Sequence, residues 1–122
     1  MKLNLWILCL CSAPSLCFAQ CGPDNVYGQI SCYEKQYKID KTLLNKTYQK
    51  LYKNYSSGDQ KLLEQSQKAL LNYKDLQCNQ LLASLSSGAQ GAGMGLINLS
   101  CNANLTKLRL DELKGLAKMI DD

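Results

Sequence analysis

A single apolar stripe between Val26 and Tyr55 constrains the fold more than any other feature of the sequence. Its side chains recur at steps of four and three residues, which places them on one face of an α-helix of about eight turns. The stripe positions are Val26, Ile30, Tyr33, Tyr37, Leu44, Tyr48, Leu51 and Tyr55, with Asp40 at the one polar position. No segment alternates with the period of two that a half-buried strand requires, so we expect an all-α fold.

Two further helices are predicted downstream, over residues 60–85 and 96–119. The first carries two neighbouring stripes, which suits a helix that touches two others. These stripes are Leu62, Ala69, Tyr73 and Leu76, and Leu63, Leu70, Gln77 and Leu81. A tight turn with Gly58 as a left-handed cap and a Ser57–Gln60 capping box is expected before this helix, and a long glycine-rich loop over 86–95 after it. The sequence therefore predicts a small antiparallel three-helix bundle.

The N-terminal segment 1–19 has the grammar of a secretory signal peptide. Lys2 precedes an apolar run over 3–10, and Cys17 and Ala19 are small residues at the −3 and −1 positions of a cleavage site. The run is too short for a membrane span of about 20 residues. We therefore expect an exported helical domain over residues 20–122, in the periplasm or secreted.

Four of the seven cysteines lie beyond this segment, at Cys21, Cys32, Cys78 and Cys101. An even number in an exported chain indicates two disulfides. Cys78 and Cys101 stand at similar distances from the glycine-rich stretch and would lie level in a helical hairpin, so we prefer this pair; Cys21–Cys32 follows by elimination, although three connectivities are possible. We do not expect a lipid anchor at Cys21, because Gln20 is not the small residue that lipoprotein signals place before the cysteine.

Composition excludes several kinds of chemistry. The chain has no His, and no C-x-x-C pair offers zinc ligands, so we expect no metal, no cofactor, no catalytic residues and no enzymatic activity. Acidic residues interrupt the lysines of the first helix, and no basic–aromatic motif accompanies them, so a nucleic-acid partner is not expected. The four N-x-S/T sequons, at Asn45, Asn54, Asn98 and Asn104, are interpreted as chance matches.

Two charged residues occupy positions that the stripes otherwise reserve for apolar side chains. These are Asp40 and Arg109, the only arginine of the chain. An unpaired charge on a packed face costs several kcal/mol. We therefore predict an interhelical salt bridge from Arg109 to Asp40 or Asp75, with an anion site or an acid catalyst as the alternative interpretation.

The order and spacing of several segments resemble a known family. The first is Asp40-x-x-Leu43-Leu44-Asn45-x-x-Tyr48-x-x-Leu51, the second runs from Ser66 through Tyr73-Lys74-Asp75 to Cys78, and the third is Cys101-x-x-x-x-Thr106-x-x-Arg109-x-x-x-Leu113. Together they resemble the LprI-like lysozyme inhibitor N-terminal domain family over residues 21–116. The chain departs from that pattern at Leu70, where the family usually has Trp, and at Lys74, where it usually has Arg.

The resemblance implies a small exported helical protein with disulfides that binds a protein partner, a lysozyme or another wall-active enzyme, with 1:1 stoichiometry. Loss of Lys2 lowers the net charge from +4 to +3, which gives little steering toward a basic lysozyme. We therefore hypothesise that shape carries the contact and that the glycine-rich loop enters a cleft, through Ser87, Gly88, Gln90, Gly91, Gly93 and Met94. The alternative is an envelope structural or interaction module without inhibitory activity.

Overall fold

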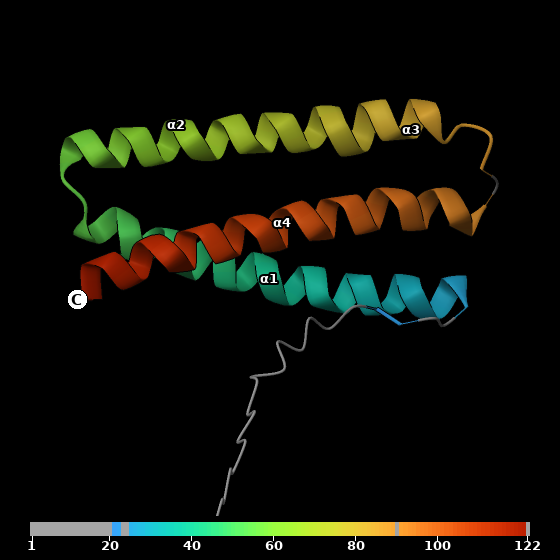
Figure 1. Cartoon of the computed structure of the whole chain (residues 1–122), viewed down its shortest axis with the longest axis horizontal. Helices are drawn as coiled ribbons and strands as arrows, with labels where there is room; N and C mark the ends of the chain where they lie inside the picture. The colour runs from blue at the N-terminus through green and yellow to red at the C-terminus, as the bar shows by residue number, and fades with distance from the viewer. Residues whose placement is uncertain (1–20, 23–24, 90, 122) are drawn as a thin grey trace, which may run out of the picture.

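The computed structural model describes residues 21–22, 25–89 and 91–121, and the expected signal segment 1–19 lies outside them. The helices are α1 (Val26–Asn54), α2 (Ser57–Lys74), the π-helical segment η1 (Asp75–Leu81), α3 (Leu82–Leu85) and α4 (Ala92–Asp121). Because α2, η1 and α3 follow one another without a break, they form one rod. This rod runs antiparallel to both α1 and α4, and α1 and α4 run parallel to each other (Figure 1). The predicted all-α bundle of three helices with two disulfides is confirmed.

The turn between α1 and α2 differs from the prediction by one residue. Ser56, not Ser57, caps α2: its hydroxyl accepts a hydrogen bond from the backbone N–H of Asp59 at 3.3 Å and donates to the Asp59 carboxylate at 2.7 Å. An acidic side chain in the first turn also favours the positive end of the helix dipole. Gly58 therefore lies inside the first turn of α2, and the expected left-handed cap is absent there.

The glycine-rich connection is shorter than predicted, because α4 begins at Ala92 rather than near residue 96. Gly93 and Gly95 are helical, and Gly91, with φ of 60°, is the one described residue with a positive φ. A glycine inside a helix costs about 1 kcal/mol. The Cys78–Cys101 disulfide and hydrogen bonds from Asn98 hold this end of α4 against η1, which offsets that cost.

The apolar core occupies one end of the bundle. Its buried members come mainly from the second half of α1 and the second half of α4, where these two helices share the most extensive interface of the fold. They are Leu44, Leu51, Leu63, Leu110, Leu113 and Ala117, with Tyr48, Tyr52, Tyr55 and Ile120 packed against them. Within this cluster α2 contributes only Leu63, so one face of α2 has no partner in the bundle.

The two disulfides tie the other end of the bundle. Cys78 of η1 is bonded to Cys101 of α4, and Cys21 is bonded to Cys32 in the second turn of α1. These are the two predicted pairs: helix register favoured Cys78–Cys101, and Cys21–Cys32 followed by elimination. Within the described residues, no helix is long and apolar enough to span a bilayer.

Candidate functional site

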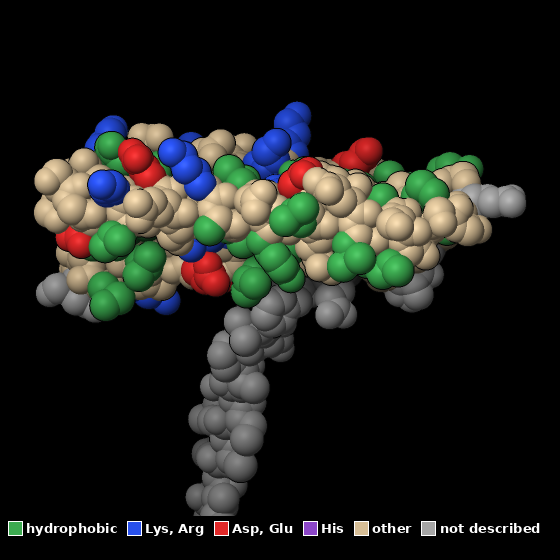
Figure 2. All heavy atoms as spheres, turned by 90° about the horizontal axis from the view of Figure 1, so that it is seen from above, with side chains coloured by type: hydrophobic (Ala, Val, Ile, Leu, Met, Phe, Trp, Pro, Cys, Tyr) green, Lys and Arg blue, Asp and Glu red, His purple; other side chains and the backbone are tan. Residues whose placement is uncertain are grey.

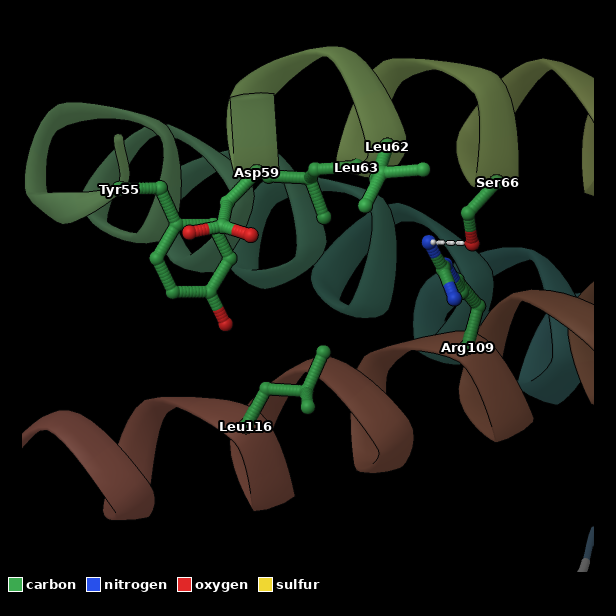
Figure 3. Close-up of a pocket in the computed structure, with 7 residues that line it drawn as sticks. All are labelled: Tyr55, Asp59, Leu62, Leu63, Ser66, Arg109 and Leu116. Carbon is green, nitrogen blue, oxygen red and sulfur yellow. Dashed lines mark hydrogen bonds between the residues drawn. The ribbon is translucent and has the colours of Figure 1, made fainter. Parts of the chain in front are cut away.

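An open groove separates the first half of α2 from the second half of α4. It has a volume of about 380 Å³, and its lining is mainly apolar. Leu62 and Leu63 face it from α2 and Leu116 faces it from α4, while Tyr55 and Asp59 close one end (Figure 3). Leu62 is 63% exposed although it is a large apolar side chain. Such a groove can accept an apolar side chain of a partner.

Arg109 lies at the other end of this groove and joins α4 to α2. Its side chain donates to Gln67 Oε1 at 2.9 Å, to Ser66 Oγ at 2.8 Å and to Glu112 Oε2 at 3.1 Å. The residue is only 7% exposed. All of the guanidinium nitrogens therefore have partners, so the arginine holds the helices together and offers little to an anionic ligand.

The acidic partner of Arg109 differs from the two that we expected. Glu112, one turn further along α4, forms the ion pair, while Asp40 and Asp75 bind side chains of their own segments. Asp40 is 2% exposed; its Oδ1 accepts from Gln36 Nε2 at 3.0 Å, and its Oδ2 has no hydrogen-bond partner among the described residues. The predicted salt bridge to Asp40 or Asp75 is therefore absent, because each of the three charges has a nearer partner one turn away.

Hydrogen bonding and burial hold the two tyrosines beside the core in their neutral form. A hydrogen bond with Glu64 raises the pKa of Tyr52, and burial raises the pKa of Tyr48. The two rings stack with centroids 6.1 Å apart. These groups pack and donate hydrogen bonds, and neither has the lowered pKa of a catalytic base.

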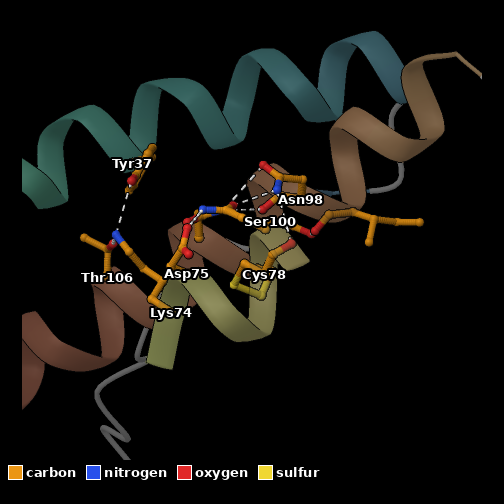
Figure 4. Close-up of a disulfide and its surroundings, with 11 residues drawn as sticks. Tyr37, Lys74, Asp75, Cys78, Asn98, Ser100 and Thr106 are labelled. Atoms are coloured by element: carbon orange, nitrogen blue, oxygen red, sulfur yellow. Dashed lines mark hydrogen bonds between the residues drawn. A yellow bond between two sulfur atoms is a disulfide. The ribbon is translucent and has the colours of Figure 1, made fainter. Parts of the chain in front are cut away.

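A smaller cavity of about 150 Å³ lies between α1 and α2. Lys41, Leu70, Lys74 and Thr106 are among its lining residues. The Lys74 ammonium is 3.4 Å from both the Tyr37 hydroxyl and Thr106 Oγ1 and lies over the Tyr37 ring (Figure 4). Leu70 and Lys74, the two positions singled out in the resemblance, both line this cavity.

A polar network surrounds the Cys78–Cys101 disulfide. Asn98 of α4 donates to the Cys78 carbonyl at 3.2 Å and to Asn79 Oδ1 at 2.9 Å, and Asn102 donates to the same Asn79 oxygen at 3.0 Å (Figure 4). In the π-helical segment the Cys78 carbonyl thus accepts a hydrogen bond from a side chain of another helix. Sequence periodicity does not mark these asparagines, although all three lie within one turn of a cysteine.

Hydrogen bonds from Asn79 and Gln80 lower the pKa of the Asp75 carboxyl. The donors are 2.8 Å and 2.9 Å from its two oxygens, at spacings of four and five residues that the π-helical turn brings together. The carboxylate therefore belongs to the network that stabilises η1.

The six residues of the candidate binding loop fall into two groups. Ser87 and Gly88 are exposed in the turn, with Gly91 at its end, while Gly93 and Met94 belong to the first turn of α4. Gln90 lies outside the described residues. The turn closes the end of the bundle next to the Cys78–Cys101 disulfide (Figure 1). It is compact, so its reach is shorter than that of the ten-residue loop that we expected.

Among the residues that the structure describes, no group of three His, Cys, Asp or Glu side chains is placed to hold a metal ion. The family model described as lysozyme inhibitor LprI matches residues 17–113 of the chain. No curated protein and no solved structure matches it.

Proposed function

The chain belongs to the LprI family of lysozyme inhibitors, and on that premise we propose that it is an exported protein that inhibits a wall-lytic enzyme by stoichiometric binding. The family match over residues 17–113, which spans α1, α2, η1 and most of α4, is the observation that carries this proposal. The enzyme is a lysozyme or another enzyme that cleaves the bacterial wall.

The chemistry of the described residues supports binding rather than catalysis. Arg109 is saturated by its own partners, and the tyrosines with shifted pKa values are held neutral. Groups of this kind favour action on an enzyme by occupation of its surface. The groove between α2 and α4 and the turn after α3 are two candidate surfaces for that contact.

The N-terminal segment and the disulfides support a location outside the cytoplasm. Segment 1–19 directs export, and the two disulfides persist in an oxidising compartment. A periplasmic or secreted protein of this kind meets lysozymes where they attack the wall. The bond between Cys21 and Cys32 supports a role for Cys21 as a disulfide partner rather than as a lipid anchor.

The experiment is a wall-lysis assay with the oxidised protein. Turbidity of a cell-wall suspension is followed with basic vertebrate-type lysozymes and with less basic lysozymes, over a range of inhibitor concentrations. We expect inhibition of at least one enzyme that is complete near equimolar protein. If the protein protects the wall from none of these enzymes, it is a non-inhibitory envelope module. The net positive charge of the chain favours this alternative, because it gives little attraction to a basic lysozyme.

The turn is tested in the same assay as a proposed contact. Replacing residues 87–90 by a two-residue link leaves the helices and disulfides in place. Weaker inhibition with an unchanged helical circular dichroism spectrum assigns the turn to the contact. Unchanged inhibition shows that the turn is not part of the contact with the enzyme. The groove between α2 and α4 is then the remaining candidate surface.

A further inference from the structure

One face of the bundle is apolar, exposed and free of lysine. On α2 it comprises Leu62, Ala69, Tyr73 and Leu76, spaced so that all four share one side of the helix and all exposed. Their spacing predicts packing against a neighbouring helix, but these four side chains are exposed in the structure. Because Leu62 lines the groove beside α4, this face borders the groove.

A matching stripe runs along α4 on the other side of the groove. Its positions are Leu105, Leu108, Glu112, Leu116 and Met119, at steps of three and four residues, and Leu116 lines the groove opposite Leu62. Leu108, Leu116 and Met119 are exposed. Glu112, with a half-exposed side chain, is the only charged member.

The distribution of charge makes this face unusual for the chain. None of the thirteen lysines lies in either stripe. The charged residues that line the groove are Asp59 and Arg109, and the charge of Arg109 is balanced by its ion pair with Glu112. Seen from the side of α2, hydrophobic side chains line one long edge of the molecule, while basic side chains gather toward the opposite edge (Figure 2). The net positive charge is therefore carried elsewhere on the surface.

We propose that this face, which we call the α2–α4 face (Leu62, Ala69, Tyr73, Leu76, Leu108 and Leu116), is the surface that binds a basic enzyme. The occupant is a positively charged protein surface that inserts an apolar side chain between Leu62 and Leu116 and places a basic side chain beside Asp59. The inference rests on the proposed function and names its contact surface. It also removes the electrostatic objection, because a partner experiences the local charge of the face more than the net charge.

Leu62→Lys and Leu116→Lys test the apolar part of the contact, with Ile39→Lys as the matched control. Ile39 is an exposed apolar residue of α1, 45% exposed, outside the α2–α4 face. We expect both groove variants to weaken inhibition at least about tenfold, since buried apolar anchors dominate such contacts, and the control to inhibit like the unmodified protein. Circular dichroism and thermal unfolding verify the fold of each variant. If Leu116→Lys does not fold, the result for Leu62→Lys, at the more exposed position, decides the test.

Ala69→Lys and Ala69→Glu test the charge of the occupant. Both residues suit an exposed helix position and differ in sign, so the lysine variant should weaken inhibition more than the glutamate variant. Added salt should weaken binding by the unmodified protein. If the two variants weaken inhibition equally, or if the glutamate variant weakens it more, the occupant is not a basic surface and the inference is wrong.

The outcomes separate the inference from the proposed function. If the unmodified protein inhibits an enzyme and both groove variants inhibit it equally well, the α2–α4 face is not the contact, and the proposed function stands. If the unmodified protein neither binds nor inhibits any enzyme, both the inference and the proposed function are wrong. If it forms a dimer in sedimentation analysis that Leu62→Lys dissociates, a second copy covers the face and the inference is wrong.

Discussion

Arg109 is the residue on which the attachment of α2 to α4 depends most. Its three hydrogen-bonded partners come from both helices, and the side chain is almost fully buried. Leu63 is the only member of the apolar core that α2 provides, so the polar contacts of Arg109 carry much of the remaining adhesion. The arginine that the sequence marked as exceptional is thus a structural residue beside the proposed binding groove.

Arg109→Lys should lower the free energy of unfolding by about 1–3 kcal/mol, because an ammonium cannot reach Gln67, Ser66 and Glu112 together. Urea denaturation followed by circular dichroism measures the change. Lys107→Ala, which removes an exposed ion pair with Asp111, is the control and should cost less than about 0.5 kcal/mol. Equal losses in the two variants would contradict the role assigned to Arg109.

Asp75 predicts a pH dependence of stability. Hydrogen bonds from Asn79 and Gln80 lower the pKa of this carboxyl in the folded protein, so its contribution is fully present above about pH 4 and is lost as the pH falls through the lower, folded value. Asp75→Ala should therefore destabilise the protein at pH 7 and make less difference at pH 2. Urea unfolding of both proteins at the two pH values measures this, and a difference that grows toward low pH contradicts it.

The partners of single charged residues could not be read from the sequence. Stripe positions showed that Asp40 and Arg109 are buried, and the structure places both side chains in the interior. Which groups face them depends on the rotation and the relative level of the helices. Arg109 lies opposite Gln67 of α2, about two turns before Asp75. Its acidic partner Glu112 comes from its own helix. Periodicity fixes the face of a helix and leaves its partner open.

At the scale of the elements, α1 followed the prediction closely and α4 did not. A continuous stripe and a polar turn define α1 within one residue. The glycines before residue 96 indicated a loop, yet Gly93 and Gly95 are helical, because η1 holds the start of α4 through Asn98 and a disulfide. A contact between distant segments therefore overrode local propensity, which sequence periodicity cannot detect.

Gly93→Ala and Gly95→Ala test the length of α4. A Cβ at either position meets no atom within 4 Å, so alanine should add about 0.5–1 kcal/mol per site to the free energy of unfolding. Gly91→Ala should have the opposite effect, because its φ of 60° strains an alanine. Thermal and urea unfolding compare the three variants. If the first two variants are less stable than the unmodified protein, α4 begins later than residue 92.

The apolar stripe of α2 marks a further limit of sequence reasoning. Leu62 and Tyr73 were expected to pack inside the bundle, and both are exposed. An apolar stripe that packs within the chain has the same periodicity as one that binds another protein. Only the positions of the other helices show which it is, so the proposed α2–α4 face could not be found from the sequence.

At the scale of the whole molecule, the bundle is held by different forces at its two ends. Apolar packing of α1 against α4 holds one end. At the other end the Cys78–Cys101 disulfide and an asparagine network join η1 to α4, and the Cys21–Cys32 disulfide joins α1 to the segment before it. Between the two ends, α1 and α4 carry buried polar residues. These are Asp40 in α1, and Thr106 and Arg109 in α4. Such a scaffold presents the groove and the turn with little conformational freedom, which favours tight binding.

Removal of the Cys78–Cys101 disulfide should lower the free energy of unfolding by about 3 kcal/mol, through Cys78→Ser with Cys101→Ser. The Cys21→Ser, Cys32→Ser pair should cost less, because that disulfide closes a loop of 11 rather than 23 residues. Urea unfolding of the two double variants measures both losses. A larger loss for the Cys21–Cys32 bond would contradict the division of the molecule described above.

Isothermal titration calorimetry of the oxidised protein into the lysozyme that it inhibits tests the central claim most directly. Stoichiometric binding predicts a single transition that saturates at one protein per enzyme, with the same affinity as the inhibition of wall lysis. Heat that saturates far from equimolar protein, inhibition without binding, or no heat and no inhibition with any lysozyme would contradict the account.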